Sequence, residues 1–138
     1  MRIEFGRLIG IALSAAALAA CDAGDVGREV RDTVDVRTIE IKLRALTSDA
    51  CHSDPASRQP WQCEKYVTQL ANAANTIEAA ADTGFPQLNG PGRRMTSAVA
   101  AYRDAGCAQQ NTADNGECVA ALEKLADAVT DARQALGS

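Results

Sequence analysis

Apolar residues recur along two long stretches of the chain at the alternating four- and three-residue spacing that is typical of an amphipathic helix. In each stretch six such positions follow one another without a break, and polar residues and alanine fill the positions between them. Each predicted helix therefore has an apolar face that must be buried against another element. The two sets are Cys63, Val67, Leu70, Ala74, Ile77 and Ala81, and Cys118, Leu122, Leu125, Val129, Ala132 and Leu136.

The segment 34–47 has two conflicting patterns. Apolar and charged side chains alternate along it, as they would in a half-buried strand. The chain offers no second strand, however, and a lone strand leaves its backbone groups unpaired. A helix is therefore predicted here, because one face then carries Val36, Ile39, Leu43 and Leu46.

A third helix is predicted over residues 93–105, with Met95, Val99 and Tyr102 on one face. Gly106 is placed to end it, because glycine accepts the left-handed conformation that closes many helices. Before this helix we expect a loop from Asp82 to Gly92, since the Phe-Pro and Asn-Gly-Pro-Gly sequences are typical of turns.

The two halves of the chain follow the same plan of helix, cysteine, loop, cysteine and helix. The second long apolar set lies 55 residues after the first, and the shorter segments match at an offset of 56. We therefore predict an all-α fold, an antiparallel four-helix bundle built from two disulfide-stapled αα-hairpins and occupying residues 34–138. Both cysteine loops would then lie at one end, roughly 25 Å from the other.

The first 21 residues are similar to a bacterial lipoprotein signal. Arg2 and Arg7 precede an apolar stretch that ends in Leu-Ala-Ala-Cys at Cys21, and this stretch is shorter than the about 20 apolar residues of a spanning helix. The resemblance implies that residues 1–20 are removed as a signal peptide. It also implies a diacylglyceryl thioether on Cys21 and a fatty acyl group such as palmitate on its new amino group, which together anchor the chain to a membrane.

This resemblance implies an extracytoplasmic, lipid-anchored protein that faces the periplasm or the cell exterior. Asp22 is similar to the residue that holds lipoproteins at the inner membrane in enteric bacteria, and the choice between inner and outer membrane stays open. Residues 21–33 are interpreted as a polar tether. Because Val26, Val30 and Val34 recur every four residues, an extension of the following helix is the alternative.

Four cysteines remain once Cys21 is assigned to lipid, an even set that suits an oxidising compartment. We predict disulfides between Cys51 and Cys63 and between Cys107 and Cys118, because each pair brackets a short loop between sequential helices. The pairing of Cys51 with Cys118 and of Cys63 with Cys107 stays open. The spacing does not match a C-x-x-C metal site, and we expect no metal.

Composition and motifs exclude several functions. The formal charge is −4, and it becomes −5 when a leader with two cations and one anion is removed, so we expect no nucleic-acid partner. The single histidine, His52, adjoins a cysteine assigned to a disulfide, which leaves Ser-His-Asp or Cys-His catalysis unsupported. No haem, di-iron or P-loop motif occurs. We therefore expect neither a cofactor nor enzymatic activity.

The mature domain is interpreted as an interaction module that contacts an unknown extracytoplasmic protein through residues 52–62 and 108–117. Binding residues concentrate on loops held by a rigid scaffold, and tryptophan is enriched at interface hot spots. An envelope structural or inhibitor-type lipoprotein is the alternative, an enzyme comes third, and Trp61 could instead cover the core. The candidate binding residues are Trp61, Arg58, His52, Gln109, Gln110 and Asn111.

The lipid anchor is directly testable. Native mature protein is expected to fractionate with membranes, because two or more acyl chains hold a protein stably where one does not. Cys21→Ser is expected to leave unprocessed precursor, which an immunoblot detects as a larger species. An intact mass of the mature protein with an unmodified Cys21 would refute this assignment.

Overall fold

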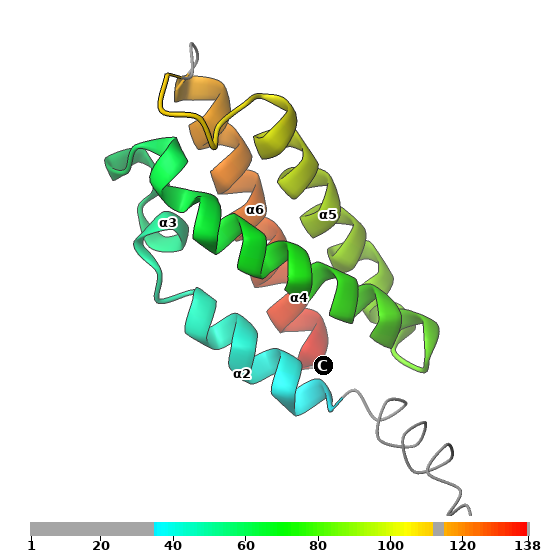
Figure 1. Ribbon diagram of the computed structural model, residues 1–138. Helices are drawn as coiled ribbons and strands as arrows, with labels where there is room; N and C mark the ends of the chain where they lie inside the picture. The colour runs from blue at the N-terminus through cyan, green and yellow to red at the C-terminus, as the bar shows by residue number, and fades with distance from the viewer. Residues whose placement is uncertain (1–34, 112–114, 138) are drawn as a thin grey trace, which may run out of the picture.

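A computed structural model describes residues 35–111 and 115–137 (Figure 1). It is 82% helical with no strand among these residues, which confirms the all-helical prediction. The predicted signal peptide, Cys21 and residues 21–33 lie outside the described part. No helix in that part is both long and apolar enough to cross a membrane.

The described residues form five α-helices and three short 3-10 helices. The α-helices are α2 (Val36–Leu46), α3 (Ala50–Ser53), α4 (Glu64–Asp82), α5 (Asn89–Asp104) and α6 (Asn115–Leu136). The 3-10 helices are η1 (Pro55–Ser57), η2 (Pro60–Cys63) and η3 (Pro86–Leu88).

The three longest helices pack side by side, with α5 in contact with both α4 and α6. Helix α2 lies against α4 and α6 and has 11 residues against the 19 of α4. The start of α2, the α4–α5 connection and the C-terminus lie at one end of the fold (Figure 1). The two cysteine-bracketed segments lie at the opposite end, which we call the cystine end.

The long apolar sets form the core, as their spacing predicted. Of the twelve positions, only Ala81 and Leu136 are half-buried, and both still pack against the core. Tyr66, Leu88, Met95 and Tyr102 are buried with them, while alanines fill much of the space between helices. These small side chains let the helix axes come close together.

Of the segment 34–47, residues Val36–Leu46 form the helix α2, as predicted, and residue 34 lies outside the described part. Asp35 caps α2, because its carboxylate accepts a hydrogen bond of 3.0 Å from the backbone N–H of Arg37. Ile39 and Leu43 are buried, whereas Ile41 is 63% exposed. The strand-like alternation therefore arose because an exposed isoleucine lies between charged residues on the outer face of a helix.

The expected loop from Asp82 to Gly92 is wrong in its second half, because η3 and the first turn of α5 occupy it. Pro91 fits there because the first turn of a helix has no intrahelical partner for a backbone N–H. Gly92 is buried, and a Cβ at this position would lie 3.2 Å from Ile77 Cγ2 of α4. The glycine therefore permits close approach of two helices, and it does not mark a turn.

The cysteine-bracketed segments are more regular than expected. The first contains α3, η1 and η2, and Pro55 and Pro60 each begin a 3-10 helix. In the second, Gly106 ends α5 with a φ of 69°, as predicted, but α6 already begins at Asn115, before the cysteine. In the sequence, Asp114 with Glu117 three residues later resembles a helix-capping pair, but Asp114 lies outside the described residues.

Both predicted disulfides are present, with Cα–Cα distances of 5.6 Å for Cys51–Cys63 and 5.5 Å for Cys107–Cys118. A buried hydroxyl joins the two bracketed segments. Tyr102 donates a hydrogen bond of 2.6 Å to the carbonyl of Pro60, and the carbonyl oxygen of Cys107 lies 3.3 Å from the same hydroxyl. The two halves of the chain are therefore tied together at the cystine end.

Removal of this hydroxyl tests its structural role. Tyr102→Phe leaves the buried carbonyl of Pro60 without its partner, and we expect a loss of about 1–3 kcal/mol in the free energy of unfolding. Tyr66→Phe is the matched control, because its partner His52 is only half-buried and can bond to water instead. Urea denaturation of the oxidised protein measures both. Equal losses in the two variants would contradict a special role for Tyr102.

Candidate functional site

The structure brings all six candidate binding residues to the cystine end. His52 lies on α3, Arg58 follows η1, and Trp61 lies in η2. The other three, Gln109, Gln110 and Asn111, are exposed in the turns that follow α5. The Tyr102 hydroxyl connects the backbones of these two groups through Pro60 and Cys107.

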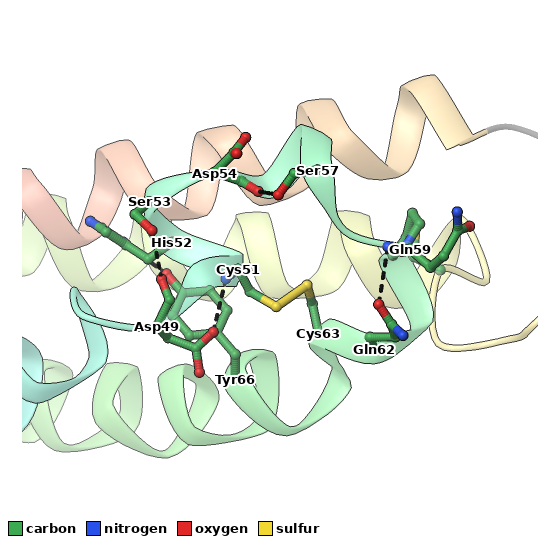
Figure 2. Close-up of a disulfide and its surroundings, with 12 residues drawn as sticks. Asp49, Cys51, His52, Ser53, Asp54, Ser57, Gln59, Gln62, Cys63 and Tyr66 are labelled. Carbon is green, nitrogen blue, oxygen red and sulfur yellow. Dashed lines mark hydrogen bonds between the residues drawn. A yellow bond between two sulfur atoms is a disulfide. The ribbon is translucent and has the colours of Figure 1, made fainter.

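His52, one of the candidate binding residues, is partly enclosed by the fold. It is half-buried, and its Nδ1 forms a hydrogen bond of 3.0 Å with the hydroxyl of Tyr66 on α4. The two rings meet edge to face, with their centroids 6.2 Å apart. Figure 2 shows His52 and Gln59 on opposite sides of the Cys51–Cys63 disulfide. His52 therefore faces away from the side on which η2 begins.

The charges around His52 come from two other elements. Burial, followed by the positive charge of Arg133 on α6, lowers the pKa of His52, while Asp49 before α3 opposes the shift. Burial and then Asp49 raise the pKa of Tyr66. At neutral pH this group is therefore a neutral imidazole bonded to a protonated phenol. Asp49, Tyr66 and Arg133 were not among the residues predicted from the sequence, because no local spacing relates α3 to α6.

Asp49 holds the start of the first cysteine segment. Its carboxylate accepts a hydrogen bond of 2.8 Å from the backbone N–H of Cys51, which caps α3 (Figure 2). Beside it lies a shallow hollow of about 440 Å³ lined by Asp49, Ala50, Cys51, Arg58 and Gln62. This hollow presents one carboxylate, one guanidinium and one amide, a combination suited to polar recognition of a partner surface.

Trp61 is half-buried. This exposure lies between that of an exposed binding residue and that of a residue that covers the core, the two alternatives that the sequence left open. Its neighbours Pro60 and Cys63 are buried and fix its backbone. At the start of η2, the backbone N–H of Gln59 donates a hydrogen bond of 3.3 Å to Oε1 of Gln62. One part of the indole therefore contacts the protein and another part is available to solvent, on a backbone held by the disulfide.

The serine hydroxyls of the first cysteine-bracketed segment are engaged with backbone carbonyls. Ser53 donates to the carbonyl of Asp49 at 3.2 Å, and Ser57 donates to the carbonyl of Asp54 at 2.9 Å. Among the described residues, no three His, Cys, Asp or Glu side chains group in a way that could hold a metal ion. The described cystine end presents hydrogen-bonding groups, the charged side chains of Asp49 and Arg58, and the half-buried ring of Trp61.

The lowered pKa of His52 predicts a pH dependence of stability. The unfolded chain binds a proton at His52 more readily than the folded chain, so stability falls as pH drops below about 6.5 and stops falling below the folded pKa. No other histidine exists in the chain to cause such a slope. His52→Asn keeps a polar group near Tyr66 and should flatten the change between pH 8 and 5.5 in thermal unfolding. An unchanged slope would refute the assignment.

No known family matches the chain, and no match was found among curated proteins or among solved structures.

Proposed function

We propose that the described helices form an antiparallel four-helix bundle made of two disulfide-stapled hairpins. The supporting observation is a closed set of contacts, in which α2 meets α4, α4 meets α5, α5 meets α6, and α6 meets α2. Helices that bury one apolar face each are stable in this arrangement. In this proposal α3 and the three 3-10 helices are connections that cover the ends of the bundle.

We further propose that this domain is a lipid-anchored interaction module, held at a membrane through Cys21, that binds another extracytoplasmic protein with its cystine end. One observation carries this proposal: the exposed polar side chains of two distant chain segments are fixed at the end of the fold opposite Asp35. Two disulfides and the Tyr102 hydrogen bond fix them. Surfaces that are ordered before binding lose less entropy when they bind.

Within this surface the proposed roles differ. Trp61 supplies an aromatic contact in the centre, while exposed Arg58, Gln109, Gln110 and Asn111 form a polar rim. His52 is less exposed and bonded to Tyr66, so its proposed role is to hold α3 in place beside the rim.

Site-specific photocrosslinking in intact cells tests this function. A benzophenone amino acid replaces Arg58 or Gln110 at the cystine end, and Gln87 at the opposite end is the matched control, since all three side chains are exposed. A discrete adduct with one extracytoplasmic protein is expected from the first two positions and not from the third.

Trp61→Ala should remove the adduct formed from Gln110. Because the indole is half-buried, the loss of unfolding free energy should stay below the about 3–5 kcal/mol of a fully buried aromatic. Circular dichroism shows whether the variant is folded. Adducts that are equal from all three positions, or that persist in a folded Trp61→Ala variant, would contradict the proposed site.

A further inference from the structure

Two grooves run along the sides of the fold at equivalent places in the two halves of the chain. The first groove, of about 370 Å³, lies between α2 and α4 and is lined by Ile39, Lys42, Ala45, Leu46, Gln69, Asn72, Ala73 and Thr76. The second groove, of about 340 Å³, lies between α5 and α6 and is lined by Arg94, Ser97, Ala98, Ala101, Lys124, Asp127, Ala128 and Asp131. Six of the eight first-groove positions map onto second-groove positions at the repeat offsets of 55 and 56.

The two grooves differ strongly in charge. In the second groove Arg94 forms an ion pair of 3.0 Å with Asp131, and Lys124 and Asp127 lie along the same walls. At the positions equivalent to Lys124, Asp127 and Asp131, the first groove has the uncharged residues Gln69, Asn72 and Thr76. The charged groove has its own internal ion pair, whereas the lining of the first groove has Lys42 as its single charged residue.

The edge of the first groove is also more apolar. Ile39 and Leu46 contribute to its lining, and the 63% exposed Ile41 of α2 corresponds at the offset of 56 to Ser97, which lines the second groove. Ile41 lies one helical turn before Ala45, which lines this groove, so its exposed side chain enlarges the apolar surface on which another chain segment can dock.

We propose that residues 22–34 of this chain fold back and dock in the first groove as an amphipathic segment. Val26, Val30 and Val34 recur every four residues, so a helical segment would place them on one face, with its charged side chains on the others. This assigns an occupant to the groove and adds a third interpretation of residues 22–34 to the tether and the helix extension that the sequence left open.

The position of this segment in the chain supports the proposal. It joins the described structure at Asp35, four residues before Ile39, the first residue of α2 in the lining of this groove. Asp35 has an extended ψ of 106° and caps α2, so α2 begins at Val36. As a helix, the 13 residues would span about 20 Å, while the lining from Ile39 to Leu46 covers about 10 Å of α2. The segment is therefore long enough to turn and follow the groove.

Charge supports the same occupant. Residues 22–34 contain four acidic and two basic side chains, whereas α2 contains three basic side chains and one acidic one. Glu29 follows Val26 by three residues and lies beside the valine face of a helix, where it could pair with Lys42 at the groove. Opposite net charges thus favour docking in addition to the apolar contact.

Docking would determine the geometry of the anchored domain. With residues 22–34 docked, Cys21 lies along the side of α2, and the α2–α4 face is held near the membrane. When they are released, the same 13 residues extend over roughly 40 Å, and the cystine end can stand away from the membrane. The docking itself does not depend on the proposed function, whereas this membrane geometry rests on the proposed lipid anchor at Cys21.

Photocrosslinking with mass mapping tests the docking in the full chain. A benzophenone amino acid at Ile41 is expected to form a crosslink to residues 22–34 of the same chain. The matched control is the same probe at the repeat-equivalent position Ser97, where no such crosslink is expected. Val26→Asp combined with Val30→Asp should lower the yield at Ile41 about tenfold, because two charged groups would face the apolar groove. Arg28→Asp, on the opposite face of the segment, should preserve it.

Three results would overturn the proposal: equal yields from Ile41 and Ser97, a yield that the two valine substitutions leave unchanged, or an adduct from Ile41 to a second copy or to another protein. Adducts from Arg58 and Gln110 report on the proposed partner separately. Failure of the docking is thereby distinguishable from failure of the proposed function.

Discussion

The hydrogen bond from the buried Tyr102 hydroxyl to the carbonyl of Pro60 is the buried polar contact that joins the two halves at the cystine end, in addition to the packing of α4 against α5 and of α2 against α6. Each disulfide closes a loop within one half, so neither of them relates the halves to each other. The hydroxyl does, because it comes from α5 in the second half and bonds to η2 in the first. Burial raises the pKa of Tyr102 to about 12, with a further contribution from Glu64, so this donor keeps its proton at physiological pH.

Sequence periodicity was enough to predict the long helices and both disulfides, because apolar spacing reports directly on burial and short loops limit which cysteines can meet. It failed at Pro91 and Gly92, where residues that usually mark turns begin a helix against α4. The candidate site was predicted in its location but not in its contacts. His52 depends on Tyr66 and Arg133, and a contact between three helices leaves no signature in local spacing.

Equivalent positions in the two halves of the chain have similar residues in the core and different residues on the surface. Ile39 and Met95, or Leu43 and Val99, occupy equivalent buried positions with apolar side chains, because each half must fill the same kind of core. On the outside the same positions differ in charge, as Thr76 and Asp131 do. Surface residues carry little of the packing constraint, so one fold can present two sides with different binding properties.

Because both disulfides lie at one end of the fold, local unfolding should begin at the other end. Each crosslink, closing a separation of 12 or 11 residues, restricts the unfolded ensemble only near the cystine end. Towards the other end the described helices are held by side-chain packing, by the Arg94–Asp131 ion pair of 3.0 Å and by a hydrogen bond of 2.8 Å from Thr96 to Glu78. There α2 meets solvent at the exposed residue Asp35. Local fluctuations should therefore begin at that end. A protease that cut the chain before Asp35 would release the helical domain in one piece, with its crosslinked end still closed.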